Sequence, residues 1–400
     1  MTDSASPLRR LRRLANRALL AYGRRQEVLQ TSIRKRDADR QYTLPPSGDR
    51  PIVLDVYVPQ NLMHLAPLYH ALKKRRLPVF VALRDALNET RDRAIARGIE
   101  AADVLMGDGL LRIKPALTVA SDQAFDWLHS PIPDLPRVQI FHGCLLKSFS
   151  NVMGELTKFS HFFFPGPLYR NTFESHVVCP VDRAIKYHDT GMPRTDDILA
   201  MRSNREAACN ALGINAARKV VLYAPTWHVE ATFFESGVDI VRTISAMGLQ
   251  CLVRPHPFTL NTTLTGLASR RAQAVLDTCR GLPGVILAHD MDDRLVMAAS
   301  DLLVADFGSI AYEYLILNRP VVFFDSPAYH RLLKEEDLEW WGRSAGSIVN
   351  DAGELQEAIF ESLRAPETMA DQRKEVLDKT YFNLGRASEV CCDALESIRG

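Results

Sequence analysis

The sequence lacks paired cysteines, long apolar runs and a strong net charge, and each absence narrows what the chain can be. Its seven cysteines are scattered, with no Cys-x-x-Cys pair and no His/Cys metal spacing, so a reduced, cytoplasmic setting is expected. No stretch reaches the roughly 18 apolar residues of a membrane span, and no apolar signal-peptide core is present. The sequence calls for no metal and no cofactor.

The net charge of +1 hides a strongly basic segment at the start of the chain. The stretch from Pro7 to Arg36 holds ten basic residues and a single acid, Glu27. Its apolar residues recur at helical spacing, which predicts an amphipathic helix within residues 1–45: Leu8, Leu11, Ala15, Ala18 and Tyr22. Such a helix binds an anionic membrane surface, each basic residue contributing on the order of 1 kcal/mol. We therefore expect a peripheral protein at the inner face of the cytoplasmic membrane.

The basic segment is also compatible with two different roles. A solvated basic tail would carry the same charge without binding anything. Nucleic-acid binding would also use the charge, but the rest of the chain is net acidic and offers no interleaved aromatic residues, so no nucleic-acid partner is expected.

Alternating strand and helix patterns divide the rest of the chain into two α/β halves. The first half contains five apolar, β-rich runs: Asp49–Gln60, Leu77–Leu83, Ala116–Ser121, Arg137–Gly143 and His161–Gly166. The second half contains five more, separated by helical patterns: KVVLYAPTW, LQCLVRPHP, GVILAHD, DLLVADFGS and PVVFFD. Near-continuous apolar strands indicate parallel sheets that are covered by helices on both faces.

The length of 400 residues exceeds what one hydrophobic core usually organises, so two Rossmann-like domains facing each other across a cleft are expected. The predicted divisions are a basic helical segment (1–45), an acceptor-side domain (46–195), a nucleotide-donor domain (196–365) and a C-terminal helical segment (366–400). Ligands of such sheets bind outside the carboxyl ends of the strands. Polar residues that directly follow a buried strand are therefore the candidates for the site.

Four predicted strands end in unusual polar or glycine residues. Histidine titrates near neutrality, so it can act as a general base or, when protonated, donate a hydrogen bond to a phosphate. Arginine offers a bidentate fork to phosphate oxygens. A glycine and serine that lead directly into a helix form a cradle for a phosphate at the helix N-terminus. The residues are His142 and Gly143, Thr226 and His228, Arg254 and His256, and Asp306, Gly308 and Ser309. Each histidine taken singly has the alternative of a hydrogen-bonded structural role.

Six segments resemble, in order and in spacing, the CDP-glycerol glycerophosphotransferases of teichoic-acid and capsule synthesis. They lie between Arg137 and Leu395: FHGCLLK, GMPRTDDIL, VLYAPTW, RPHP, ADFGSIAYEYLILNRPVVFF and YFNLGRASEVCCDAL. The resemblance implies the GT-B fold, in which the C-terminal of two Rossmann-like lobes holds the donor nucleotide. This is the architecture that the strand pattern predicts independently.

The resemblance also implies roles for single residues. His142 corresponds to the histidine of the family's H-G-T-P-L-K motif, which here also includes Gly143 and Lys147, and His256 corresponds to that of R-P-H-P. Asp306 to Ser309 correspond to the segment D-Y-S-S. The chain departs from these motifs at several positions, which bear on the identity of donor and acceptor: Cys144 and Leu145 for Thr-Pro, Phe307 for Tyr, Gly308 for Ser, and His228 where Arg is common.

The expected activity is transfer of glycerol phosphate, or a related polyol phosphate, from a CDP-activated donor to a hydroxyl of a lipid-linked or surface glycan, with release of CMP. His142 and His256 are the expected catalytic residues, with Arg254, Asp306, Gly308, Ser309 and Thr226 on the donor phosphates and Gly143, Lys147 and His228 in support. A GT-B glycosyltransferase or epimerase acting on a nucleotide sugar is one alternative. An inactive membrane-associated scaffold is the other.

Overall fold

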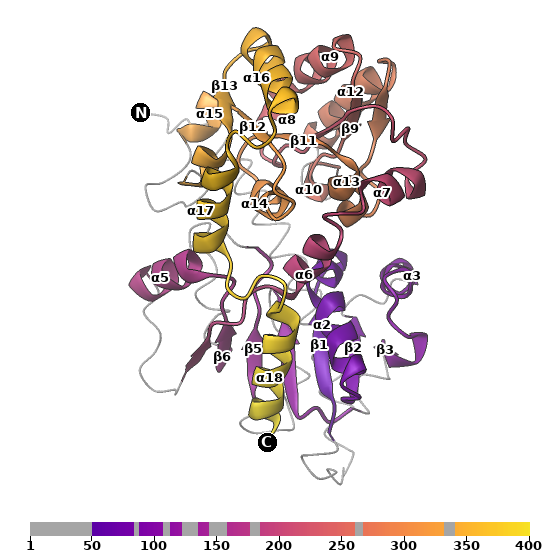
Figure 1. The fold of residues 1–400 in the computed structure, drawn as a ribbon. Helices are drawn as coiled ribbons and strands as arrows, with labels where there is room; N and C mark the ends of the chain where they lie inside the picture. The colour runs from indigo at the N-terminus through magenta and orange to yellow at the C-terminus, as the bar shows by residue number, and fades with distance from the viewer. Residues whose placement is uncertain are drawn as a thin grey trace, which may run out of the picture.

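The computed structural model describes residues 50–83, 88–106, 113–121, 135–143, 158–176, 185–260, 267–331 and 341–400. The basic segment for which an amphipathic helix is predicted lies outside these residues, and so does Lys147. The described parts form two α/β lobes, one above the other in Figure 1, each built on its own parallel sheet.

The first sheet has seven strands in the order β3-β2-β1-β4-β5-β6-β7, and every neighbouring pair is parallel. The interior strand β1 is completely buried, as expected for a strand covered on both faces. The strands are β1 (Ile52–Val56), β2 (Val79–Leu83), β3 (Val104–Leu105), β4 (Leu117–Ala120), β5 (Arg137–Gln139), β6 (His161–Phe163) and β7 (Lys186–His188).

The second sheet has six strands in the order β10-β9-β8-β11-β12-β13, again all parallel. The strands are β8 (Val220–Tyr223), β9 (Gln250–Val253), β10 (Val285–Leu287), β11 (Leu302–Ala305), β12 (Val321–Phe324) and β13 (Ser347–Val349). The ten predicted strands are all present, and the prediction of two parallel sheets is confirmed. The strands β3, β7 and β13 were not predicted, and all three stand at sheet edges.

Helices pack on both sheets (Figure 1). In the first lobe they are η2 (Pro59–Asn61), α2 (Leu62–Lys74), α3 (Asn88–Ala96), η3 (Ala101–Asp103) and α5 (Pro167–His176). The second lobe contains α7 (Arg205–Ala211), α8 (Thr232–Glu235), α9 (Gly237–Ala246), α10 (Pro257–Leu260), α12 (Leu267–Arg280), α13 (Asp293–Ala299), α14 (Ile310–Leu315), α15 (Pro327–His330), η7 (Trp341–Ala345) and α16 (Ala352–Arg364).

Three further helices connect the lobes. Helix α6 (Pro193–Ala200) packs against α2 of the first lobe and against α13 of the second. Helix α17 (Ala370–Thr380) packs on α14 and α5, and α18 (Ala387–Arg399) then returns to α2 and α6. Cys391, Cys392 and Leu395 of α18 are fully buried in the first lobe's core. The last helix of the chain therefore stabilises the first domain.

Both sheets reverse their strand order next to their first strand, between β1 and β4 and between β8 and β11. Such reversals open a space at the carboxyl ends of the strands, where the flanking connections diverge to opposite faces. The chain that follows β1, β4 and β5 therefore meets at one place, and the chain that follows β8, β9 and β11 meets at another.

Candidate active site

His142 lies in the first lobe directly after β5, on a strained backbone. The preceding residue, Phe141, has φ 55°, a left-handed conformation that is unusual for a bulky side chain. The Phe141 amide donates to Oε1 of Gln139 at 2.9 Å, and its ring packs among the buried aromatic rings of Phe162, Phe164 and Tyr169. Such strain costs on the order of 1–3 kcal/mol and is concentrated at functional sites. Here it turns His142 outward from the end of the strand.

The hydrogen bond of the His142 ring identifies its basic atom. Nδ1 lies 3.1 Å from the backbone carbonyl oxygen of Ser121, which follows β4. A carbonyl oxygen only accepts, so Nδ1 carries the hydrogen in this contact and the lone pair of the neutral ring is on Nε2. The side chain is exposed. His142 thus has the tautomer and the accessibility of a general base that acts through Nε2.

Arg254 follows β9 in the second lobe and is held by carbonyl groups. Its Nη1 donates to the carbonyl oxygens of Ala288 at 2.7 Å and Met291 at 2.9 Å. Burial lowers the pKa of Arg254, and the nearby carboxylate of Asp293 opposes that shift. Because the side-chain hydrogen bonds of Arg254 to described residues all run through Nη1, the rest of the guanidinium fork is available for an anionic ligand.

His256 has the opposite tautomer to His142. Its Nδ1 lies 3.2 Å from the backbone N–H of Phe258, which only donates, so Nδ1 is the acceptor and the hydrogen of the neutral ring is on Nε2. The same pattern holds for His228, whose Nδ1 accepts from the N–H of Glu230 at 3.2 Å. In these contacts the N–H of both His228 and His256 is on Nε2, which suits a phosphate oxygen rather than a hydroxyl proton.

Asp306 is fully buried at the point where the second sheet reverses its order. Its Oδ1 accepts from the backbone N–H groups of Thr226 at 2.8 Å and Phe307 at 2.7 Å, and Oδ2 accepts from the Thr232 hydroxyl at 2.9 Å. Burial raises the pKa of Asp306, and these hydrogen bonds act against the rise. The carboxylate thus lies behind the loops, and any effect on a donor is transmitted through Thr226 and Phe307.

The remaining predicted residues lie at the strand ends with space around them. Among the described residues, a Cβ at Gly143 would contact nothing within 4 Å, and one at Gly308 would approach a side-chain methyl of Ile310 at 3.6 Å. Ser309 occupies the N-cap position of α14, but its hydroxyl makes no capping hydrogen bond to that described helix. The half-buried Ser309 hydroxyl is therefore not engaged by the start of its own helix.

A buried ion-pair cluster, which the sequence patterns did not reveal, joins the two lobes. Arg194 of α6 donates from Nε and Nη2 to Oε2 of Glu313 at 2.9 and 2.8 Å, and from Nη2 to Asp293. Arg97 of the first lobe reaches Oδ1 of Asp293 at 3.3 Å. We call Arg97, Arg194, Asp293 and Glu313 the lobe junction. In sequence, the segment GMPRTDDIL is as typical of a polar hinge loop as of an Arg/Asp site.

The lobe junction lies between the candidate residues of the two lobes. Arg194 and Asp293 both influence the pKa of Arg254, and both also influence the pKa of His64 at the start of α2. The His64 ring in turn contacts that of His142, with 6.4 Å between the ring centroids. The structure therefore brings His142 and Arg254 to the same interface. His64 is a further residue that the sequence did not reveal, because nothing distinguishes it from a core position of an amphipathic helix.

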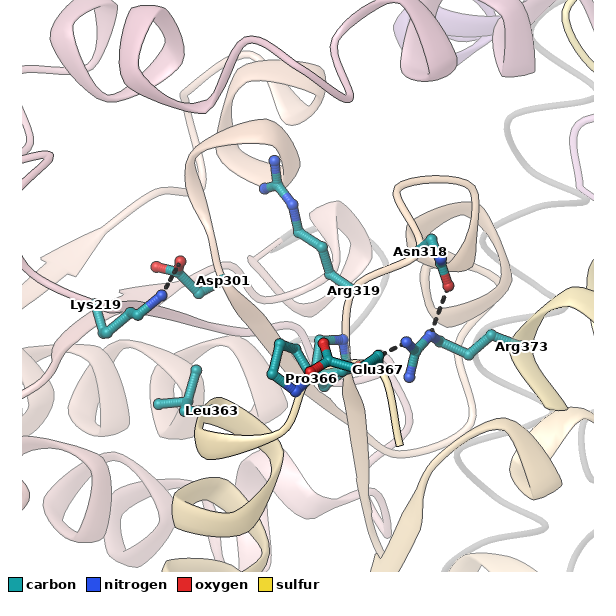
Figure 2. Close-up of a pocket in the computed structure, with 9 residues that line it drawn as sticks. Lys219, Asp301, Asn318, Arg319, Leu363, Pro366, Glu367 and Arg373 are labelled. Atoms are coloured by element: carbon teal, nitrogen blue, oxygen red, sulfur yellow. Dashed lines mark hydrogen bonds and ion pairs between the residues drawn. The ribbon is translucent and has the colours of Figure 1, made fainter. Parts of the chain in front are cut away.

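A pocket of about 290 Å³ lies elsewhere, at the amino ends of β8, β11 and β12 (Figure 2). Its cations already have partners: Lys219 pairs with Asp301 at 3.0 Å, and Nε of Arg373 donates to Oδ1 of Asn318 at 3.0 Å. The pocket lies at the amino ends of the strands, whereas Arg254 and His256 lie at the carboxyl ends. It is therefore separate from the candidate site.

Two kinds of feature are absent from the part of the chain that the structure describes. No helix there is both long and apolar enough to cross a membrane. No group of three or more His, Cys, Asp or Glu side chains there is arranged to hold a metal ion.

Two doubly wound lobes, with histidines and an arginine at the carboxyl ends of their strands, form the GT-B architecture. A profile of the family described as CDP-Glycerol:Poly(glycerophosphate) glycerophosphotransferase matches residues 137–397, and the chain belongs to this family. Teichoic acid glycerol-phosphate transferase of Staphylococcus aureus is 23% identical over 298 residues, covering 68% of this chain and 73% of that protein. Teichoic acid poly(glycerol phosphate) polymerase of Bacillus subtilis is 26% identical over 52% of this chain, which spans only 28% of the polymerase.

Solved structures agree on the architecture. The wall teichoic acid polymerase TagF superposes with a TM-score of 0.67 and 14% identity, covering 99% of this chain and 98% of that chain. UDP-GlcNAc 2-epimerase from Neisseria meningitidis gives a TM-score of 0.58 and 16% identity, covering 86% of this chain and 100% of that chain. At these identities the likeness establishes the fold alone, and the fold is GT-B.

Proposed function

We propose that this protein transfers glycerol phosphate, or a related polyol phosphate, from CDP-glycerol to a hydroxyl of a lipid-linked or surface glycan acceptor, releasing CMP in cell-envelope polymer synthesis. Membership of the glycerophosphotransferase family supports the donor, and the teichoic-acid relatives support the acceptor. The opposite tautomers of His142 and His256 support different roles for the two lobes. The first lobe offers a proton acceptor, and the second offers N–H donors.

In the proposed reaction the acceptor oxygen attacks the phosphorus that bears the glycerol. The bond from that phosphorus to the bridging oxygen of the pyrophosphate breaks, and CMP departs with the electron pair. Nε2 of His142 takes the proton of the attacking hydroxyl. Arg254 and His256 donate hydrogen bonds to the pyrophosphate and neutralise the charge that develops on CMP, while Ser309 holds a phosphate oxygen. Catalysis of this kind is mostly positioning and charge stabilisation.

Release of CMP from CDP-glycerol, measured with an acceptor analogue, tests this assignment. We expect His142→Ala to lower kcat by about 10²–10⁴-fold while leaving the affinity for CDP-glycerol nearly unchanged, because a general base contributes mainly to the transition state. Arg254→Ala and His256→Ala should weaken CDP-glycerol binding about tenfold or more, since a hydrogen bond to a charged group is worth roughly 1.5–3 kcal/mol.

The matched control is His161→Gln, a histidine at the amino end of β6, away from the strand ends that carry the site. It should retain both binding and turnover. Near-normal turnover of His142→Ala at saturating donor would exclude it as the base. Products distinguish the chemistry, because a nucleotide-sugar enzyme of the same fold would yield a nucleoside diphosphate and a glycoside, or an epimer, instead of CMP and a phosphodiester. A scaffold would bind nucleotide without turnover.

We further propose that the protein is peripheral on the inner face of the cytoplasmic membrane, where a lipid-linked acceptor is found. The support is the sequence of the first 36 residues, with ten basic residues and an apolar stripe at helical spacing. Anionic lipid would attract the arginines over a Debye length of about 8 Å at physiological ionic strength, so binding should be reversible and sensitive to salt.

A further inference from the structure

His64 carries an unexplained polar atom inside the candidate site. The residue is only 6% exposed, and its Nδ1 is buried without a hydrogen-bond partner among the residues that the structure describes. Leaving a buried polar atom unpaired costs about 1–3 kcal/mol, so an apolar ring of similar size would make the folded protein more stable at this position. Unpaired groups of this kind are rare in folded proteins and need a reason.

The place of His64 in the fold points to that reason. It lies in the first turn of α2, which begins at the carboxyl end of β1, beside the reversal of the first sheet. Oδ1 of Asn61 accepts from the N–H groups of Tyr57 at 2.9 Å and Val58 at 2.8 Å, which closes the turn from β1 into the helix. The turn directs His64 to the His142 ring, with 6.4 Å between centroids and 63° between the planes.

Burial, with the charges around it, keeps the His64 ring neutral. Burial lowers the pKa of His64 well below its usual value, and the Arg194 guanidinium, His142 and Arg97 act in the same direction, against the Asp293 carboxylate. A neutral imidazole offers one N–H donor and one acceptor nitrogen. The ring is therefore suited to hydroxyl groups, which both donate and accept, more than to a phosphate.

We infer that His64 is a further substrate-binding residue of the acceptor side, whose ring forms a hydrogen bond with a hydroxyl of the polyol acceptor adjacent to the hydroxyl that His142 deprotonates. This inference rests on the proposed function. It assigns the acceptor a chemical class, a vicinal diol such as a glycerol end, and it explains why a polar ring is kept where an apolar one would be more stable.

The experiment compares two soluble acceptor analogues, one ending in a glycerol unit and one lacking the hydroxyl adjacent to the reacting one, with CDP-glycerol as donor. The wild type should favour the diol in kcat/KM by roughly 3- to 10-fold, the value of one neutral hydrogen bond. His64→Phe should lose that preference and keep its affinity for CDP-glycerol. Its midpoint of thermal unfolding should stay equal or rise, because the unpaired nitrogen is gone.

Opposite effects on stability and on the preference for the diol acceptor distinguish substrate binding by His64 from a role in packing. His161→Phe is the control, since His161 is also buried but its Nδ1 is engaged with His188 at 3.0 Å, so it should lose stability and keep the preference for the diol. Unchanged discrimination in His64→Phe, or a fall in stability without a change in discrimination, would overturn the inference while leaving the proposed function intact. No CMP release by the wild type would overturn both.

Discussion

Replacing Arg194 by methionine should reveal how strongly the lobe junction holds the protein together. Arg194 is 4% exposed and makes three hydrogen bonds to two carboxylates. Without it, Asp293 retains the weaker 3.3 Å contact with Arg97, and Glu313 loses the ion pair that the structure gives it. Removing one partner of a buried ion pair costs about 3–5 kcal/mol. We expect Arg194→Met to lose stability of that order.

The destabilisation by Arg194→Met should also depend on pH, and it should be largest at neutral pH. The positive charge of Arg194 holds the pKa of Asp293 far below its usual value, despite burial. A carboxylate with a lowered pKa contributes stability that is fully present above its unfolded pKa, near 3.9, and is lost as the pH falls toward the folded value. The difference in stability between the wild type and Arg194→Met should therefore shrink as the pH falls below about 3.9.

Urea unfolding at neutral pH, followed by fluorescence, measures the first effect, and an acid titration measures the second. The control is Arg170→Met, which removes two ion pairs of a half-exposed arginine, with Glu174 and Asp189, and should cost about 0–1 kcal/mol. The double variant Arg194→Met with Glu313→Gln should recover part of the loss. If Arg194→Met cost no more than Arg170→Met, the cluster would be incidental to stability and the reasoning would fail.

Two more predictions concern the donor loops and the basic segment. Asp306→Asn should cost about 1–3 kcal/mol and weaken donor binding, because the amide NH2 replaces one carboxylate oxygen and cannot accept there, either from the N–H groups of Thr226 and Phe307 or from the Thr232 hydroxyl. The exposed Asp239→Asn is its control, and equal stability of the two variants would refute a role for the hydrogen bonds of Asp306 in holding these loops. Deleting residues 1–36 should leave CDP-glycerol binding intact and reduce sedimentation with anionic vesicles at low salt. Equal binding of the full chain to neutral and anionic vesicles would contradict membrane attachment through the basic segment.

The fold was predictable from the sequence wherever strands are long and buried. The runs KVVLYAPTW and DLLVADFGS contain the fully buried segments VVLY and LLVA, which form β8 and β11 in the centre of a parallel sheet. The three missed strands carry weaker signals: Val104–Leu105 has two residues, Lys186–His188 is polar, and Ser347–Val349 is partly exposed. Edge strands lack a full apolar environment on both sides, so their sequences do not need the continuous apolar run that indicates a central strand.

The site was only partly predictable, because strand ends can be located from sequence but their partners cannot. His142, Arg254 and His256 follow β5 and β9, as the pattern indicates. The ring of His142 is oriented by the carbonyl of Ser121, 21 positions earlier in the chain. Arg194 meets carboxylates that are 99 and 119 positions away. No local pattern encodes such contacts, because they depend on how two sheets and a connecting helix are placed in three dimensions.

The division of the histidines between two lobes has a consequence for the proposed chemistry. In an in-line displacement, the attacking hydroxyl and the departing CMP lie on opposite sides of the phosphorus. A base on the first lobe and hydrogen-bond donors to phosphate on the second lobe match that arrangement. The distance between nucleophile and phosphorus is then set by how the lobes meet, and misplacement by about 1 Å can cost on the order of 10²-fold in rate.

The lobe junction has no direct part in the proposed proton transfer, yet it should influence turnover through this geometry. Arg194→Lys, which keeps the charge but not the three hydrogen bonds, should therefore lower kcat more than it lowers donor affinity, and steady-state CMP release together with calorimetric titration of CDP-glycerol measures the two effects. An equal loss of both, or a loss of affinity alone, would contradict a role for the lobe junction in setting the distance between the lobes.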